Sequence, residues 1–516
     1  MKAIAKNRLT NFSEESGKIE TSEQENLATI FRGVKTDLSG RVFNALIRYG
    51  YIILLARLFG PELLGIFFLG LIVIEFSGVL ARLGFETGVL KYVSIYSGQG
   101  DSARVKGAIL RSAGIVLLSS LIWAVLLFIG SDFLSDTIFH KAELSSVLKI
   151  FAFALPFSSV TLVLLSATQA FHTLKYRVIV EFVTNPVLNI LLVILVYLAG
   201  YGIGGVVAAY GFSFAVCAVL SLFFVIKLFP DLLNPNINAV HQTRKLIRFS
   251  TPLILVNFLS LMMMWTDVLM LGYFRTAAEV GIYNTAVKTA FFINFVIMSF
   301  TSIFAPRISE LYARGEIGQL EQLFKTVTRW IFGLSLPLFL MVTILAEDIL
   351  GFFGAEFGAG SVSLILLALA HLVNASVGSV RYVLIMADRE KWVLWNMVGV
   401  SLLNICLNRL FIPHLGMEGA AGATAIAIIV INFIMLFQVY YHLRIHPYQL
   451  SFLKPLLGGV VAAVVVLLGR DIIGWGNSAV KIAVLSFMLL AIFVAVLKLL
   501  KLDDQDRFIL QQLRLK

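Results

Sequence analysis

The chain has 516 residues, of which 59% are hydrophobic and 14% charged, and its mean hydropathy is +0.91. Soluble domains carry about 25% charged residues, so this composition excludes an ordinary soluble protein and favours one that uses the lipid bilayer as its solvent. The net charge of +11 fits a membrane protein with basic cytoplasmic loops. Because no zinc-finger spacing or basic DNA-reading helix is present, we expect no nucleic acid as a partner.

Residues 1–37 form a polar segment that we expect to be a disordered cytoplasmic tail. It is not a signal peptide, because no apolar run follows its charged start. The rest of the chain contains about fourteen apolar stretches of about 20 residues, the length that a helix needs to cross the hydrocarbon. In chain order these predicted spans are 39–59, 63–83, 107–129, 147–170, 178–199, 203–228, 247–272, 280–304, 327–346, 361–386, 392–412, 417–441, 452–469 and 478–499.

The loops between these spans alternate in charge. One set is rich in lysine and arginine, and the opposite set is neutral or acidic, as around Asp132 and Glu347. Basic loops lie in the cytoplasm. An even number of spans then places both termini in the cytoplasm, and we expect a multi-pass protein of the inner or plasma membrane. The basic residues are Lys91, Arg104, Lys106, Arg111, Lys175, Arg177, Arg244, Lys245, Arg248, Arg307, Arg314, Lys325, Arg389, Lys391, Arg444 and Lys454.

The chain also resembles itself at an offset of about 215 residues. Four short motifs recur in the same order at equivalent places of equivalent spans, beginning with Gly65-Ile66-Phe67 and its counterpart Gly281-Ile282-Tyr283. The offset corresponds to six spans, an even number, so the two halves share one orientation and form a parallel repeat. We therefore predict an all-α integral membrane protein with two six-helix lobes around a central cavity.

This architecture divides the chain into five parts and favours alternating access, in which one lobe rocks against the other. A static scaffold that merely records a gene duplication is the alternative. The predicted parts are the tail 1–37, an N-lobe 38–229, a cytoplasmic linker 230–245, a C-lobe 246–442, and residues 443–516 with the last two helices and a cytoplasmic end.

Several polar and ionisable residues lie inside predicted spans, where each charge costs about 2.5–3.5 kcal/mol unless it faces a partner or a wet cavity. They gather in spans one and two and in the repeat-equivalent spans seven and eight. In the first span their spacing places them on one helical face. The candidate substrate-binding residues are Arg41, Asn44, Arg48, Glu75, Asp267, Asn284 and Lys288.

These side chains suggest two kinds of chemistry. Arg41, Arg48 and Lys288 suit an anionic group such as a pyrophosphate, because arginine can form paired hydrogen bonds to phosphate oxygens. Glu75 and Asp267 are candidate counter-ions, proton sites or cation sites. Structural ion pairs between helices remain the alternative, and Arg41 can also reach the headgroups from the inner boundary. Arg82 and Glu86, at the end of the second span, favour a local ion pair.

No catalytic, metal or cofactor site is predicted. The two cysteines, Cys217 and Cys406, lie in apolar runs without metal-site spacing. A Walker A motif is absent from the sequence, and the predicted outer loops are short. We therefore predict a transporter that is not an enzyme, and we expect it to act as a monomer.

Two motifs connect the chain with a known family. Residues 55–62 read LARLFGPE and are followed by Gly65, and residues 83–87 read LGFET. The glycine turns at 278–283 and 416–422 are of the same kind. Over about residues 36–500 the chain resembles the polysaccharide flippases of the multidrug/oligosaccharidyl-lipid/polysaccharide superfamily.

The resemblance implies a two-lobed bundle of twelve or fourteen helices. It implies export of an undecaprenyl-pyrophosphate-linked oligosaccharide for surface polysaccharide, with other polysaccharide-assembly membrane proteins as candidate partners. Two alternatives from the same superfamily stay open. One is an ion-coupled drug or metabolite antiporter; the other is a lipid II flippase, whose arginine cluster in the first span Arg41 and Arg48 match only loosely.

Overall fold

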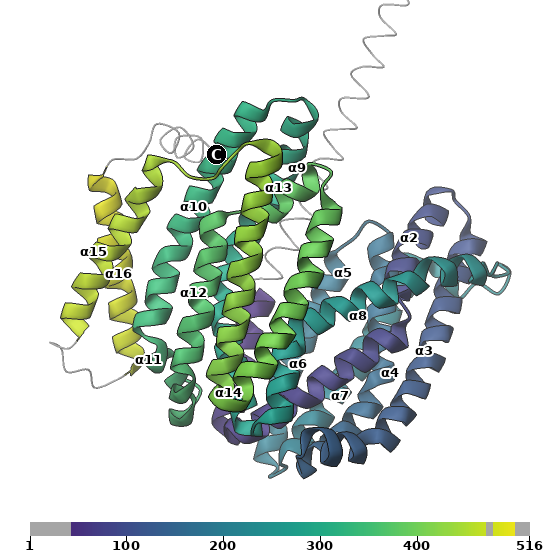
Figure 1. Ribbon diagram of the computed structural model, residues 1–516. Coiled ribbons are helices and arrows are strands. Elements are labelled where there is room, and N and C mark those ends of the chain that lie inside the picture. The colour runs from purple at the N-terminus through teal and green to yellow at the C-terminus, as the bar shows by residue number, and fades with distance from the viewer. Residues whose placement is uncertain (1–42, 471–477, 501–516) are drawn as a thin grey trace, which may run out of the picture. The chain divides into compact units, whose positions relative to one another are not determined.

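The computed structural model describes residues 43–470 and 478–500, and these residues form helices and their connections without a β-strand (Figure 1). The predicted tail 1–37 and Arg41 lie outside the described residues. Twelve helices of the described ranges are long and apolar enough to cross a membrane. The prediction of an all-α membrane protein is therefore confirmed.

The first long helix, Phe43–Arg82, includes residues 43–59 of the first predicted span, 39–59, and residues 63–82 of the second, 63–83. Residues 39–42 lie outside the described residues. Within this helix Gly60 has a φ of 74°, a left-handed conformation that glycine adopts without the steric cost of a side chain. Pro61 follows at once, and its fixed φ and missing N–H suit the first position of a new helix. The sequence Gly60-Pro61 thus separates the first helical stretch from the second.

The helices pack into two compact units. Of the described residues, 43–51, 70–137 and 142–261 belong to unit 1, and 52–69, 138–141, 262–470 and 478–500 belong to unit 2. The long helices Phe43–Arg82 and α8 (Thr243–Phe274) contribute residues to both units.

Unit 1 is built around α4 (Ala142–Ala170), which packs against α2, α3 and α7. A core of buried side chains such as Phe85, Val116 and Val163 joins these helices. The other elements, in chain order, are α2 (Phe85–Gly98), α3 (Ser102–Asp132) with a π-helical end (Phe133–Phe139), α5 (Lys175–Arg177), the π-helix η2 (Val178–Thr184), α6 (Asn185–Leu198), α7 (Ile203–Leu228) and η3 (Pro230–Leu232).

Unit 2 contains the C-terminal helices, among which α12 packs against α9, α10 and α14 (Figure 1). The last two helices, α15 and α16, pack on each other and on α10 through a separate apolar cluster. In chain order the elements are α9 (Ala277–Ala313), α10 (Ile317–Ile344), α11 (Ala346–Gly351), η4 (Ala355–Gly360), α12 (Ser361–Val377), α13 (Val380–Met386), α14 (Glu390–Leu443), η5 (Leu450–Phe452), α15 (Leu453–Arg470) and α16 (Ser478–Leu499).

Helix α14 holds two predicted spans, 392–412 and 417–441. Its 54 residues would extend roughly 80 Å if straight, far beyond the roughly 30 Å of hydrocarbon. Gly416, with φ 58° and ψ −134°, breaks the helix between the two spans. Counting α14 and Phe43–Arg82 as two crossings each gives the fourteen predicted spans, and that count stays a prediction.

A close backbone approach inside unit 2 reflects the internal repeat. A Cβ added to Gly65 would lie 1.8 Å from the carbonyl oxygen of Ala277, and one added to Gly281 would lie 2.1 Å from that of Pro61. Pro61 and Ala277, like Gly65 and Gly281, are 216 positions apart in the sequence. The approach is thus reciprocal between residues that occupy equivalent places in the two repeats of the sequence.

Candidate functional site

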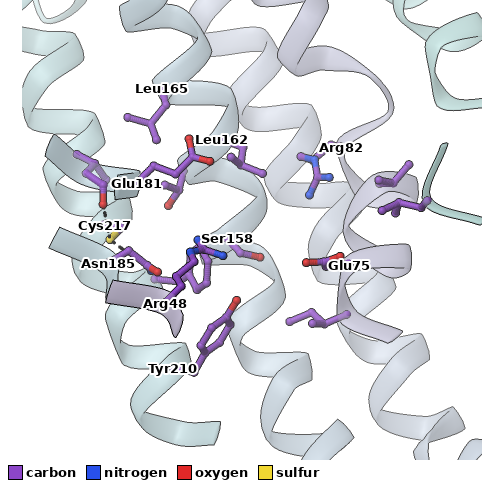
Figure 2. Close-up of a pocket in the computed structure, with 16 residues that line it drawn as sticks. Arg48, Glu75, Arg82, Ser158, Leu162, Leu165, Glu181, Asn185, Tyr210 and Cys217 are labelled. Carbon is purple, nitrogen blue, oxygen red and sulfur yellow. Dashed lines mark hydrogen bonds between the residues drawn. The ribbon is translucent and has the colours of Figure 1, made fainter. Parts of the chain in front are cut away.

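Unit 1 contains a partly open polar pocket of about 250 Å³, which we call the N-pocket (Figure 2). Seven of its lining residues are apolar, among them Ile74, Val79 and Phe214. The helices Phe43–Arg82, α4, α6, α7, α8 and the π-helix η2 contribute to the wall. The nine remaining lining residues are Arg48, Glu75, Arg82, Ser158, Thr161, Glu181, Asn185, Tyr210 and Cys217.

Two of the predicted substrate-binding residues, Arg48 and Glu75, line this same pocket. They come from the two stretches of the first long helix, before and after Gly60. A third, Asn44, lies one turn before Arg48 and accepts a hydrogen bond from Arg48 Nε at 3.0 Å through its side-chain oxygen. Asn44 therefore orients the guanidinium without lining the pocket itself.

Arg82 also lines the N-pocket, in addition to forming the local pair expected from the sequence. Its Nε lies 3.9 Å from Glu86 Oε2, a long ion-pair distance. The other carboxylate oxygen of Glu86 accepts a hydrogen bond from Asn257 Nδ2 at 3.0 Å. Arg82 Nε and Glu86 Oε2 are buried, and no hydrogen-bond partner for them lies within the described ranges. Arg82 thus retains hydrogen-bonding capacity at the pocket wall.

The residues that η2, α6 and α7 contribute to the N-pocket were not predicted from the sequence. Glu181 lies in the π-helix η2 and is held by Arg177, whose Nε donates to Glu181 Oε2 at 2.8 Å. Next to it, Asn185 donates to the sulfur of Cys217 at 3.8 Å (Figure 2). Asn185 also accepts a hydrogen bond from Asn189 at 3.1 Å. Single-turn π-helical segments occur frequently at functional sites. The signal available in the sequence was a carboxylate, Glu181, inside the predicted span 178–199.

Unit 2 contains the other predicted residues, of which Asp267 belongs to a buried polar network. The carboxylate of Asp267 accepts hydrogen bonds from Tyr283 OH at 2.5 Å, from the backbone N–H of Val268 at 2.9 Å and from Thr424 Oγ1 at 3.4 Å. Asn404 donates to Thr424 at 3.3 Å, and Asn408 in turn donates to Asn404 at 2.9 Å. Since Asp267 is only 8% exposed, these bonds replace the hydration that the carboxylate loses.

The last two predicted residues lie on α9. Asn284 is fully buried, and neither polar atom of its side chain has a hydrogen-bond partner in the part of the chain that the structure describes. One turn later, Lys288 Nζ lies 4.7 Å from the centre of the Trp265 ring, within the range of a cation–π interaction. The structure thus brings Asn44, Arg48 and Glu75 together in unit 1, whereas Asp267, Asn284 and Lys288 lie in unit 2.

Comparison with known proteins gives one family match over more than half of the chain. The family model described as "Polysaccharide biosynthesis protein" matches residues 30–312, and the MatE model matches residues 252–410. A curated protein from Haloferax volcanii, a probable low-salt glycan biosynthesis flippase, is 28% identical over 165 residues. That alignment covers 32% of this chain and 35% of the relative, so the chain spans about a third of the length of this relative.

Solved structures share the fold over most of the chain. The lipid II flippase MurJ in an inward closed conformation aligns with a TM-score of 0.69 and 15% identity, covering 90% of this chain and 98% of that one. An inward-facing multidrug transporter of the MATE family and the MOP superfamily aligns with a TM-score of 0.62 and 18% identity, covering 78% and 94%. These likenesses show that the chain shares the fold of these transporters.

Proposed function

The chain belongs to the family of polysaccharide biosynthesis proteins, and we propose that it flips a lipid-linked oligosaccharide from the cytoplasmic to the outer leaflet for surface polysaccharide synthesis. The carrier would be a polyprenyl pyrophosphate of the undecaprenyl type. The protein would act by alternating access in the cell membrane, with both termini in the cytoplasm, as a transporter that is not an enzyme.

The observation that carries this proposal is the N-pocket. Arg48, Glu75 and Arg82 lie on a helix apolar enough to span a membrane, yet their side chains line a common cavity. Ionisable groups at membrane depth are costly, and they mark substrate or ion pathways when they face such a cavity. A polar head group that crosses the bilayer requires this kind of intramembrane environment.

Two of the similar proteins support a saccharide-bearing lipid as the cargo. The relative from Haloferax volcanii is described as a glycan biosynthesis flippase, and the structural neighbour with a TM-score of 0.69 is a lipid II flippase. The family description of this chain, polysaccharide biosynthesis, points to the same class of cargo. Lipid II remains one specific alternative within this class.

An ion-coupled antiporter is the second candidate function, and the Asp267 network favours it. This network lies within residues 252–410 of the MatE match except for Thr424. A buried carboxylate surrounded by hydroxyl and amide groups suits a proton or a hard cation. The same network would also serve a flippase that uses an ion gradient. The two functions are therefore distinguished by which substrate the protein transports, a lipid-linked oligosaccharide or a drug.

The test is deletion of the gene, followed by measurement of the lipid-linked oligosaccharide pool and of surface polysaccharide. We expect the precursor to accumulate and the polymer to fall. The wild-type gene should restore both, whereas Arg48→Ala should fail to do so although the variant protein reaches wild-type levels in the membrane. Normal polysaccharide together with new sensitivity to cationic drugs would instead establish the antiporter.

A further inference from the structure

We propose that the N-pocket binds one sugar unit that carries no net negative charge, and that it is not the site of the pyrophosphate. The inference rests on the proposed function and assigns a chemical role to a cavity within it. Three properties of the pocket carry it: the balance of its charges, its size, and the mixture of hydrogen-bond donors and acceptors on its wall.

The charges of the wall are balanced. Arg48 and Arg82 contribute two guanidinium groups, and Glu75 and Glu181 contribute two carboxylates. Carboxylates repel a pyrophosphate and cannot donate hydrogen bonds to its oxygens. Glu181 is also fixed in place by Arg177 at 2.8 Å. An anion site would use arginines without such carboxylates, so the balance favours a neutral or zwitterionic ligand.

The volume of the N-pocket limits what can enter it. Pockets for drug-sized ligands have roughly 300–1,000 Å³, and the N-pocket has about 250 Å³. The cavity therefore holds a group of the size of a single sugar ring, while the rest of an oligosaccharide and the lipid chain must lie elsewhere. The pocket would recognise one unit of the cargo.

The wall matches the surface chemistry of a sugar. Sugar hydroxyl groups both donate and accept hydrogen bonds, and here carboxylates accept, guanidinium groups donate, and the side chains of Ser158 and Asn185 do both. Figure 2 shows these groups around the cavity, with Glu75 and Arg82 on one helix and Glu181 and Asn185 on another segment. The oxygens of a pyrophosphate only accept hydrogen bonds, so they cannot pair with the carboxylates of the wall.

Aromatic rings supply the complementary apolar surface. The rings of Tyr210 and Phe214, one turn apart on α7, have centroids 5.0 Å apart and are steeply inclined to each other, at 63°. Aromatic side chains present a large apolar surface, and Tyr adds a polar group at its edge. The C–H face of a sugar ring can pack on such a surface while its hydroxyl groups reach Glu75 and Ser158.

The experiment is saturation-transfer difference NMR on the full-length protein in detergent. The probes are methyl glycosides of glucose, galactose, N-acetylglucosamine and glucuronic acid, with inorganic pyrophosphate as the competitor. The variants are Glu75→Gln and Tyr210→Leu, and the matched control is Glu143→Gln, which changes an exposed carboxylate of unit 1 outside the pocket. Each variant is checked for wild-type size-exclusion behaviour and thermal unfolding.

We expect at least one uncharged glycoside to bind saturably, about tenfold more weakly in Glu75→Gln and Tyr210→Leu, because each loses a hydrogen-bonding or packing partner. Binding should be unchanged in Glu143→Gln, and pyrophosphate should not compete. The inference is overturned if no uncharged glycoside binds, if binding survives both pocket variants, or if pyrophosphate displaces the glycoside. Gene deletion tests the transport function separately: precursor accumulation together with failed glycoside binding would refute only this sugar subsite.

Discussion

The N-pocket of unit 1 and the Asp267 network of unit 2 both contain carboxylates, but in opposite environments. In unit 1 the side chains of Arg48 and Glu75 are exposed at the wall of a cavity. In unit 2 the carboxylate of Asp267 is buried and accepts three hydrogen bonds from its own protein. The difference leads to opposite predictions: substitutions at the N-pocket should affect transport more than stability, and substitutions in the Asp267 network should affect stability most.

The greatest loss of stability should come from breaking the Asp267 network. Asp267→Ala removes the acceptor of Tyr283 and Thr424 in a buried site, where an unsatisfied polar group costs about 1–3 kcal/mol. We expect the variant to be destabilised by about 2 kcal/mol or more, and Asp267→Asn by less because it keeps a carbonyl acceptor. Thermal unfolding in detergent measures both. Equal stability of Asp267→Ala and the wild type would show that the network contributes nothing to the fold.

A slightly smaller loss is expected at the close backbone approach between Gly65 and Ala277. The added methyl group of Gly65→Ala would overlap the Ala277 carbonyl, and overpacking of this kind costs about 1–3 kcal/mol. Gly114→Ala is the matched control, because nothing lies within 4 Å of the added methyl group. Gly114 lies inside helix α3, where the change from glycine to alanine should leave the stability unchanged or raise it. Equal unfolding temperatures of Gly65→Ala and Gly114→Ala would contradict the close approach between Gly65 and the Ala277 carbonyl.

At the N-pocket, a substitution should reduce transport without reducing the stability of the fold. Arg48 is exposed, so Arg48→Ala should change the free energy of unfolding by less than about 0.5 kcal/mol. Transport should nevertheless fall at least about tenfold, as expected for loss of a hydrogen bond from a charged group. Unfolding and flipping are measured on the same purified protein. A parallel loss of both would place Arg48 with Asp267 as a structural residue.

Asn44, which acts through Arg48, should give the weakest effect. Its side chain accepts one hydrogen bond, at 3.0 Å, from an exposed guanidinium, and such a bond contributes about 0.5–1.5 kcal/mol. Asn44→Ala should therefore reduce the flipping rate a few-fold, and it should have no further effect when Arg48→Ala is already present. An additive loss in the double variant would mean that Asn44 acts independently.

Hydropathy in the sequence predicted the membrane helices well. The predicted spans 203–228 and 478–499 coincide with α7 and α16. Each is a long apolar run that begins directly after a glycine or a polar residue, so its start can be recognised in the sequence. The helix α2, Phe85–Gly98, was missed. It contains Glu86 and Lys91 among its apolar residues, so no window of about 20 apolar residues marks it.

The candidate site could be predicted only in part. Arg48 and Glu75 stood out as costly charges in apolar helices, and both line the N-pocket. Glu181 and Tyr210 complete the pocket from distant parts of the chain, and their proximity depends on how η2 and α4 pack against α7. Helical spacing relates residues on one helix, but it contains no information about which helices become neighbours.

Flipping by the purified protein in liposomes tests the proposed function without the complications of the cell. The probe is a fluorescent polyprenyl-pyrophosphate-linked oligosaccharide from the host, and a membrane-impermeant quencher reports the leaflet in which it lies. We expect the wild-type protein to move the probe between leaflets, and Arg48→Ala, folded and equally reconstituted, to move it at least about tenfold more slowly. Equal rates for wild type, Arg48→Ala and protein-free liposomes would contradict the proposed function.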